Sequence, residues 1–228
     1  MKANETPGNV ERVVVSFSGG LDSTTLLCWA LRRYEVNALT FHYGSKHARQ
    51  EIKAAESITA KFGVAHKIIH LPFINELFNS DLLASGGTIP EGHYEDNSMR
   101  RTVVPFRNGI MLSIAVGYAE SIGATTVLYA AHSGDHAIYP DCRPEFLNAM
   151  SEAGRLGTYA GVEIKDPFIG MSKGDIVTLG TDLQVPFGST YSCYNGRPKH
   201  CGKCGACVER KEAFVLAGVP DPTTYESE

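Results

Sequence analysis

The sequence lacks a long apolar run and a strong excess of either charge. Nowhere do the roughly 18 apolar residues of a membrane span follow one another, and the polar stretch 1–12 lacks the apolar segment of a secretory signal. With 21 basic and 25 acidic residues the formal charge is −4, which disfavours general binding to nucleic acid. We therefore expect a cytoplasmic protein that binds small molecules, with neither a membrane nor a nucleic acid as partner.

Two common nucleotide-binding motifs are also missing. No GxGxxG follows the first predicted strand, and no GxxxxGK[ST] occurs anywhere in the 228 residues. These absences exclude the usual dinucleotide fingerprint and the Walker-type phosphate loop. If the chain binds a nucleotide, it uses another loop.

Cysteine is scarce, but four of the six cysteines cluster. They are spaced Cys193-x7-Cys201-x2-Cys204-x2-Cys207, whereas Cys28 and Cys142 stand alone. Cytosolic cysteines are reduced thiols or metal ligands, and four thiolates suit tetrahedral Zn²⁺ with no open position. We predict one structural zinc ion per chain. An iron–sulfur cluster is the alternative, although Lys211 stands where a ferredoxin-type run has its next cysteine.

Short apolar runs alternate with helical patterns along the chain. Strands are predicted over 13–17, 36–43, 66–71, 126–131 and near 162–165, and helices over 24–34, 52–62, 110–122, 145–155 and 172–183. Such alternation predicts an α/β fold with a parallel sheet and helices on both faces. We expect a nucleotide-binding α/β domain over 1–185 and a cysteine region with a C-terminal helix over 186–228, packed on the first. The long polar segment 79–102 is a candidate lid.

A turn of small residues joins the first strand to its helix, with the sequence Ser18-Gly19-Gly20-Leu21-Asp22-Ser23. In open α/β sheets ligands bind at this edge, where glycines and a helix N-terminus suit a phosphate. Asp22 would repel a phosphate, but Mg²⁺ commonly bridges a carboxylate and phosphates. The alternative is an ordinary tight turn in which Asp22 or Ser23 caps the helix.

The turn SGGLDS resembles the SGGxDS loop of the PP-loop ATP pyrophosphatases. The resemblance implies the Rossmann-like, adenine-nucleotide α-hydrolase type of sheet, with ATP as co-substrate cleaved between its α- and β-phosphates. It implies that the phosphates are held by Phe17, Ser18, Gly19, Gly20, Leu21, Asp22, Ser23, Thr24 and Thr25. Asp22 would also lie near Mg²⁺.

Further segments resemble the 7-cyano-7-deazaguanine synthase family within that superfamily, from Val13 to about Val219. They are His42–Gly44 with His47 and Glu51, Val104–Asn108, Gly134–His136, Tyr139–Phe146 and the four terminal cysteines. One departure is Ser45, where the family more often has glutamine. The resemblance implies an ATP-dependent C–N ligase that converts 7-carboxy-7-deazaguanine and ammonia into 7-cyano-7-deazaguanine in queuosine biosynthesis. A PP-loop enzyme acting on tRNA and a non-catalytic nucleotide- and zinc-binding module are the alternatives.

The resemblance also suggests roles for residues outside the loop. Asp22 and Lys173 are the expected catalytic residues, and the expected substrate contacts are Arg107, Asn108, Asp135, Asp141 and Arg143. A carboxylate after the fourth strand can accept hydrogen bonds from the guanine-like N–H edge, and Arg143 can pair with the substrate carboxylate. The alternatives are a turn held by Asp141 and Arg143, and a solvated Lys173. By analogy the protein forms a homodimer.

Overall fold

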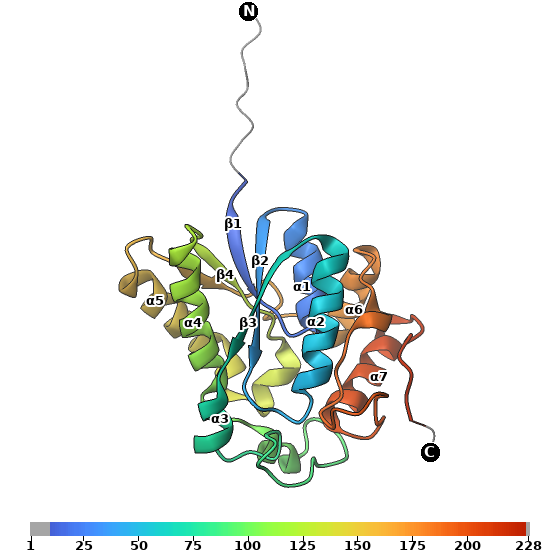
Figure 1. Cartoon of the computed structure of the whole chain (residues 1–228). Helices are drawn as coiled ribbons and strands as arrows, with labels where there is room; N and C mark the ends of the chain where they lie inside the picture. The colour runs from blue at the N-terminus through green and yellow to red at the C-terminus, as the bar shows by residue number, and fades with distance from the viewer. Residues whose placement is uncertain (1–9, 227–228) are drawn as a thin grey trace, which may run out of the picture.

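The fold is built on a parallel sheet of five strands, seen in a computed structural model that describes residues 10–226 (Figure 1). The strands are β1 (Arg12–Ser16), β2 (Glu35–His42), β3 (Ala65–His70), β4 (Thr126–Leu128) and β5 (Glu163–Lys165), in the spatial order β3-β2-β1-β4-β5. All neighbouring pairs are parallel. The predicted α/β class is confirmed, whereas the outermost ends of both predicted domains, 1–9 and 227–228, lie outside the described residues.

Helices cover both faces of the sheet, as Figure 1 shows. They are α1 (Leu21–Leu31), α2 (Ala48–Phe62), α3 (Pro72–Leu77), α4 (Arg107–Ser121), α5 (Pro144–Gly157), α6 (Lys173–Asp182) and α7 (Gly205–Ala217), with short 3-10 turns η1 (Asn97–Thr102), η2 (Ser133–Ala137), η3 (Pro140–Cys142) and η4 (Phe187–Ser189). In the view of Figure 1, α4 and α5 lie on one side, and α1, α2 and α6 lie on the other. No helix among residues 10–226 is both long and apolar enough to cross a membrane.

The central strand β1 separates two apolar cores. Val14 belongs to the core under α4, together with Leu112 and Ala115, whereas Val13 and Val15 belong to the core under α1. Successive side chains of a strand point to opposite faces, so a strand that is covered on both sides is apolar throughout. This is why the valine run identified β1 from the sequence.

The order of the strands reverses at β1. From β1 the chain continues through β2 to β3 at one edge of the sheet, and it then returns to β4 on the other side of β1 and continues to β5 at the opposite edge. Such a switch point leaves a crevice at the carboxyl ends of the strands. Strand β4 ends at Leu128 instead of the expected Ala131, because the N–H of Ala131 donates to Oδ2 of Asp166 (2.7 Å) and not to a neighbouring strand.

The segment 79–102, expected as a lid, is packed against the body of the protein. Leu83 and Met99 are buried within it, and Arg101 pairs with Asp81 at 2.6 Å. Lys46 reaches from the β2–α2 connection and donates to the backbone oxygens of Asp81 (2.7 Å) and Gly86 (3.2 Å). These contacts hold the segment over the edge of the crevice.

Helix α7 packs on α6, and the cysteine region leads into its start (Figure 1). Arg210 of α7 is fully buried and donates to the backbone oxygen of Phe187 (2.9 Å) and to Oγ1 of Thr190 (2.8 Å). Phe214 lies edge-on to Phe187 and shares a core with Val13. The division into two domains at residues 185 and 186 stays a prediction.

Candidate active site

The turn after β1 is held open toward the crevice by its own residues. Gly19 has φ +78°, and a Cβ on it would lie 2.7 Å from the backbone nitrogen of Ala55 in α2. Only glycine fits there, because a side chain would meet both backbone strain and a neighbouring backbone. Oγ of Ser18 accepts from the N–H of Gly20 (3.2 Å) and lies 3.1 Å from Oγ of Ser23.

The start of α1 has no side-chain cap from the described residues. Gly20 occupies the N-cap position, so neither Asp22 nor Ser23 caps the helix as the alternative interpretation required. The N–H groups of the first turn of a helix have no partners within the helix, and they carry partial positive charge. Here they face the crevice, which suits a bound anion.

A cavity of about 230 Å³ lies at the carboxyl ends of β1, β2 and β4. The predicted phosphate residues that line it are Phe17, Ser18, Gly20, Leu21, Asp22 and Ser23, and the other predicted residues that line it are Arg107, Asn108, Asp135 and Lys173. The remaining predicted phosphate residues, Gly19, Thr24 and Thr25, do not line the cavity, and both threonines are fully buried. Most of the expected site is thus brought together in one cavity.

Lys173 lies between two carboxylates at the end of the cavity formed by the SGGLDS turn. Its Nζ is 3.2 Å from Oδ2 of Asp22 and 2.6 Å from Oε2 of Glu209. Burial disfavours the ammonium form, but these two carboxylates outweigh that effect and raise the pKa of Lys173. Ser172 caps α6 in a capping box with Asp175, which fixes the direction in which Lys173 leaves the helix. The lysine is therefore held in the cavity as a cation rather than solvated.

Asp22 keeps one oxygen free. Its Oδ1 is buried and has no hydrogen-bond partner among residues 10–226. Burial by itself would raise the pKa of Asp22, but the nearby Lys173 and His132 lower it overall, so the carboxylate is ionised. Asp22 lines the cavity, and an ionised carboxylate in that position is a ligand of the type that Mg²⁺ prefers.

His132, Asp135 and Glu209 bring three potential metal ligands within 4.8 Å of one another. Nδ1 of His132 accepts from the N–H of Gly134 (3.2 Å), and Nε2 lies 3.5 Å from both Asp135 and Glu209 and 3.4 Å from Nζ of Lys173. The Lys173 ammonium thus already contacts two of the three groups, His132 and Glu209. This group is a charge network around Lys173 and a poor metal site.

Arg107 and Asn108 lie at the start of α4, on the opposite wall. Arg107 donates to the hydroxyl of Tyr43 (3.0 Å) and lies over its ring. The backbone N–H of Asn108 donates to Oδ2 of Asp141 (3.0 Å), so Asp141 caps α4 from a neighbouring turn. Arg143 is exposed and donates to the backbone oxygen of His136 (3.0 Å). Asp141 and Arg143 therefore do not line the cavity.

Glu51 and His47 contribute a second polar group to the cavity. Both line it, and Oε2 of Glu51 lies 3.4 Å from Nε2 of His47. Burial raises the pKa of Glu51 to about 8, although nearby Arg107 opposes the rise. Burial and the same arginine lower the pKa of His47 to about 4. Near neutral pH both groups are largely uncharged and can exchange hydrogen bonds with a polar ligand.

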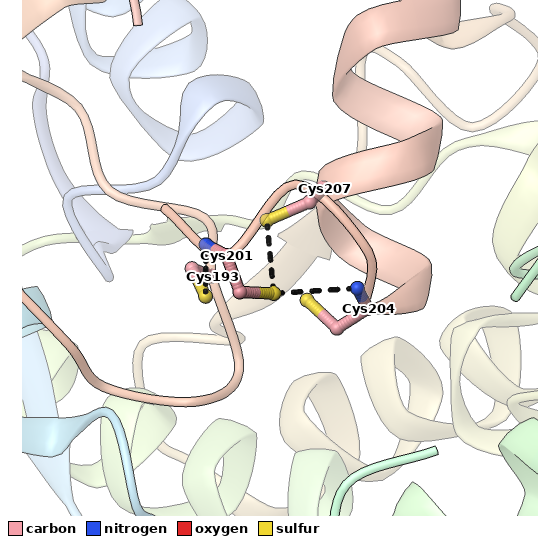
Figure 2. A group of neighbouring side chains, drawn as sticks. All are labelled: Cys193, Cys201, Cys204 and Cys207. Carbon is pink, nitrogen blue, oxygen red and sulfur yellow. Dashed lines mark hydrogen bonds between the residues drawn. The ribbon is translucent and has the colours of Figure 1, made fainter. Parts of the chain in front are cut away.

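The four cysteines Cys193, Cys201, Cys204 and Cys207 meet at one point, as Figure 2 shows. All are buried free thiols, and Sγ of Cys201 lies 3.9 Å from Sγ of Cys207. Ligands about 2.3 Å from a tetrahedral zinc are about 3.8 Å apart, which this spacing matches. The backbone N–H of Cys204 points at Sγ of Cys201 (3.3 Å), an arrangement that stabilises a thiolate. The cluster can hold a metal.

Several cavity residues have no role in the expectations from the sequence. Glu209 comes from α7 and meets Lys173, which is 36 residues away in the chain. Tyr129, Tyr191 and Tyr194 also line the cavity. His47 and Glu51 were marked only by resemblance, without a role. No local pattern distinguishes such residues, because their neighbours are set by how α6, α7 and the sheet pack.

Known proteins resemble the chain over nearly its full length. The family model described as "Queuosine biosynthesis protein QueC" matches residues 12–218. Proteins named 7-cyano-7-deazaguanine synthase from Marinomonas sp. and Pseudoalteromonas atlantica are 49% and 52% identical over 218 residues, covering 95% of this chain and 99% and 100% of theirs. A solved NMN synthetase from Francisella tularensis shares the fold, with a TM-score of 0.50 and 16% identity over 92% of this chain and 79% of that one. The chain belongs to the QueC family of queuosine biosynthesis proteins.

Proposed function

We propose that the chain catalyses the ATP-dependent conversion of 7-carboxy-7-deazaguanine and ammonia into 7-cyano-7-deazaguanine. The observation that carries this proposal is that the SGGLDS loop, Lys173 and Arg107 line one cavity in a member of the QueC family. Two full-length relatives are named for this product. The proposed substrates are all small molecules.

The phosphate end of the cavity suits ATP. Free N–H groups at the start of α1 and the hydroxyls of Ser18 and Ser23 are donors for phosphate oxygens, and Gly19 and Gly20 allow close approach. Oδ1 of Asp22 would hold Mg²⁺, whose charge would offset that of the phosphates. Lys173 adds a second positive charge at the same end. Asp22 and Lys173 are thus the proposed catalytic residues.

The deazaguanine base is proposed to bind on the opposite wall, near Arg107 and Glu51. A guanine-like edge offers N–H and amino donors, which the oxygens of Glu51 can accept, and Arg107 can pair with the substrate carboxylate. Asn108 and Asp135 remain proposed contacts because they line the cavity. Asp141 supports this wall through Asn108, and Arg143 lies outside it.

The reaction needs two activations because a carboxylate oxygen is a poor leaving group. An oxygen of the acid attacks the α-phosphorus of ATP and pyrophosphate leaves, which gives an acyl adenylate. Ammonia then displaces AMP and forms the amide. The amide oxygen attacks a second ATP, and loss of AMP and protons from nitrogen leaves the nitrile. Positioning and charge stabilisation suffice for these steps, and no covalent enzyme intermediate is required.

The four-cysteine cluster is proposed to hold one Zn²⁺ in a structural role. Four buried sulfur ligands complete a tetrahedral site with no open position, and Lys211 stands outside it. The free thiols also suit the reducing cytoplasm, where we place the enzyme. A homodimer is proposed by analogy, and Val215 and Leu216 on the exposed side of α7 are apolar residues available for such a contact.

The function is tested by mass spectrometry of the products formed from the acid, ammonium, ATP and Mg²⁺. We expect the nitrile from the wild-type protein and no nitrile from Asp22→Ala. Failure of well-folded, metal-loaded wild-type protein to form nitrile would refute the proposal.

A further inference from the structure

Helix α7 connects the cysteine cluster directly to the phosphate end of the cavity. Cys204 is the N-cap of α7, Cys207 lies in its first turn, and Glu209 follows on the same helix. Glu209 is 9% exposed, and its carboxylate lies 2.6 Å from Nζ of Lys173 and 3.5 Å from Nε2 of His132. The position of Glu209 is therefore set by the same helical turn that carries two of the four sulfur ligands.

We propose that Glu209 is a positioning residue that couples metal binding at the four cysteines to nucleotide binding at the SGGLDS loop. The proposal rests on the proposed function, since it takes the loop as the ATP site. The metal fixes the first turn of α7, and Glu209 on that helix holds Lys173. The position of Lys173 then determines whether the Asp22 carboxylate is free to bind a cation.

The charges around Lys173 explain why Glu209 matters. Lys173 lies nearer to Glu209 (2.6 Å) than to Asp22 (3.2 Å), and it touches only Oδ2 of Asp22. Without the carboxylate of Glu209, the attraction to Asp22 is left unopposed, and the ammonium moves onto that carboxylate. Asp22 would then be less free to hold a cation with a triphosphate, so nucleotide affinity would fall.

The rest of α7 is anchored independently of the metal. Arg210 is buried and donates to the backbone oxygen of Phe187, to Thr190 and to Ser192, and Phe214 packs in the core. Loss of the metal therefore frees the start of α7 without removing the helix from the fold.

The test measures the affinity for Mg-ATP by calorimetry, with zinc-loaded and chelator-treated protein. In wild type we expect metal removal to weaken binding about 10-fold, within the usual range of coupling between sites. Loaded Glu209→Gln should bind about 10-fold more weakly than wild type, with less than about 2-fold further loss on metal removal. Glu212→Gln is the matched control, because Glu212 lies on the same helix, is half-exposed and pairs with His93 instead. It should behave as wild type.

A reciprocal measurement keeps the test valid if the chelator-treated protein unfolds. Coupling between two binding sites is equal in both directions, so ATP should raise the zinc affinity of wild type in chelator competition, and should not raise that of Glu209→Gln. The proposal is overturned if ATP raises zinc affinity equally in both proteins, or if it does so in neither. Loaded wild type that binds no ATP would instead refute the proposed function, together with this inference.

Discussion

Nζ of Lys173 lies 3.2 Å from Oδ2 of Asp22, so the first residue of α6 touches the second residue of α1. The two residues come from distant parts of the chain and meet at the carboxyl end of the sheet. Each stabilises the charged form of the other. A fixed cation and a fixed anion are therefore present in the cavity before any substrate binds.

Replacement of Lys173 by methionine should abolish most of the activity. The variant keeps most of the length of the side chain but removes the charge that is proposed to stabilise the phosphates, so kcat/KM for ATP should fall on the order of 100-fold or more. Lys165→Met is the control, because Lys165 is half exposed and pairs only with Glu163 at 3.3 Å among the described residues. Equal activity of Lys173→Met and wild type would contradict a role at the phosphates.

Gly19→Ala should destabilise the SGGLDS loop by more than the backbone strain that a positive φ causes. Its Cβ would lie 2.7 Å from the backbone nitrogen of Ala55 and 3.0 Å from the backbone oxygen of Glu51. Gly63→Ala is the matched control, because Gly63 has φ +64° but nothing within 4 Å of its Cβ position. Strain of roughly 1–2 kcal/mol is common to both variants. We expect Gly19→Ala to lose more stability in urea and most of its activity, and Gly63→Ala to stay active.

The sequence predicted the sheet well because β1 is covered on both faces and its valines form an unbroken apolar run. The SGGLDS turn at the cavity was noticed because it is a short contiguous motif, and the cysteine cluster because of its spacing. Asp141 and Arg143 were expected in the cavity because they follow β4, but the turn at η3 directs Asp141 to the start of α4 instead. Glu209 could not be found, because its contact with Lys173 depends on the packing of α7 against α6.

Glu51→Gln should make stability less dependent on pH. The folded protein retains the proton of Glu51 up to about pH 8, whereas the ordinary pKa is 4.5. The contribution of this group to stability is therefore complete below about pH 4.5 and is lost as the pH rises through 8. Glutamine cannot ionise, so the variant should gain stability relative to wild type between pH 5 and 9, by on the order of 2–4 kcal/mol.

Urea unfolding at several pH values measures this difference. Glu56→Gln, on the exposed side of the same helix, serves as the control and should follow the wild-type curve. A wild-type curve that is flat from pH 5 to 9 would show that Glu51 is not a buried, protonated acid.

Cys204→Ser should release the metal and destabilise the C-terminal region. Cys204 is fully buried at the start of α7, and four ligands are needed to close a tetrahedral site. We expect less than one equivalent of zinc per chain by mass spectrometry and a lower Tm. Cys28→Ser, which changes a buried thiol far from the cluster, should retain the zinc. Iron in the wild-type protein would contradict the assignment of zinc.

The fate of the substrate oxygens tests the double activation most directly. With both carboxylate oxygens of 7-carboxy-7-deazaguanine labelled as ¹⁸O, each activation transfers one oxygen to an α-phosphate. The account predicts two AMP molecules per nitrile, each carrying one ¹⁸O, and none of the label in pyrophosphate. Label in water or in pyrophosphate, or a single AMP per nitrile, would contradict it.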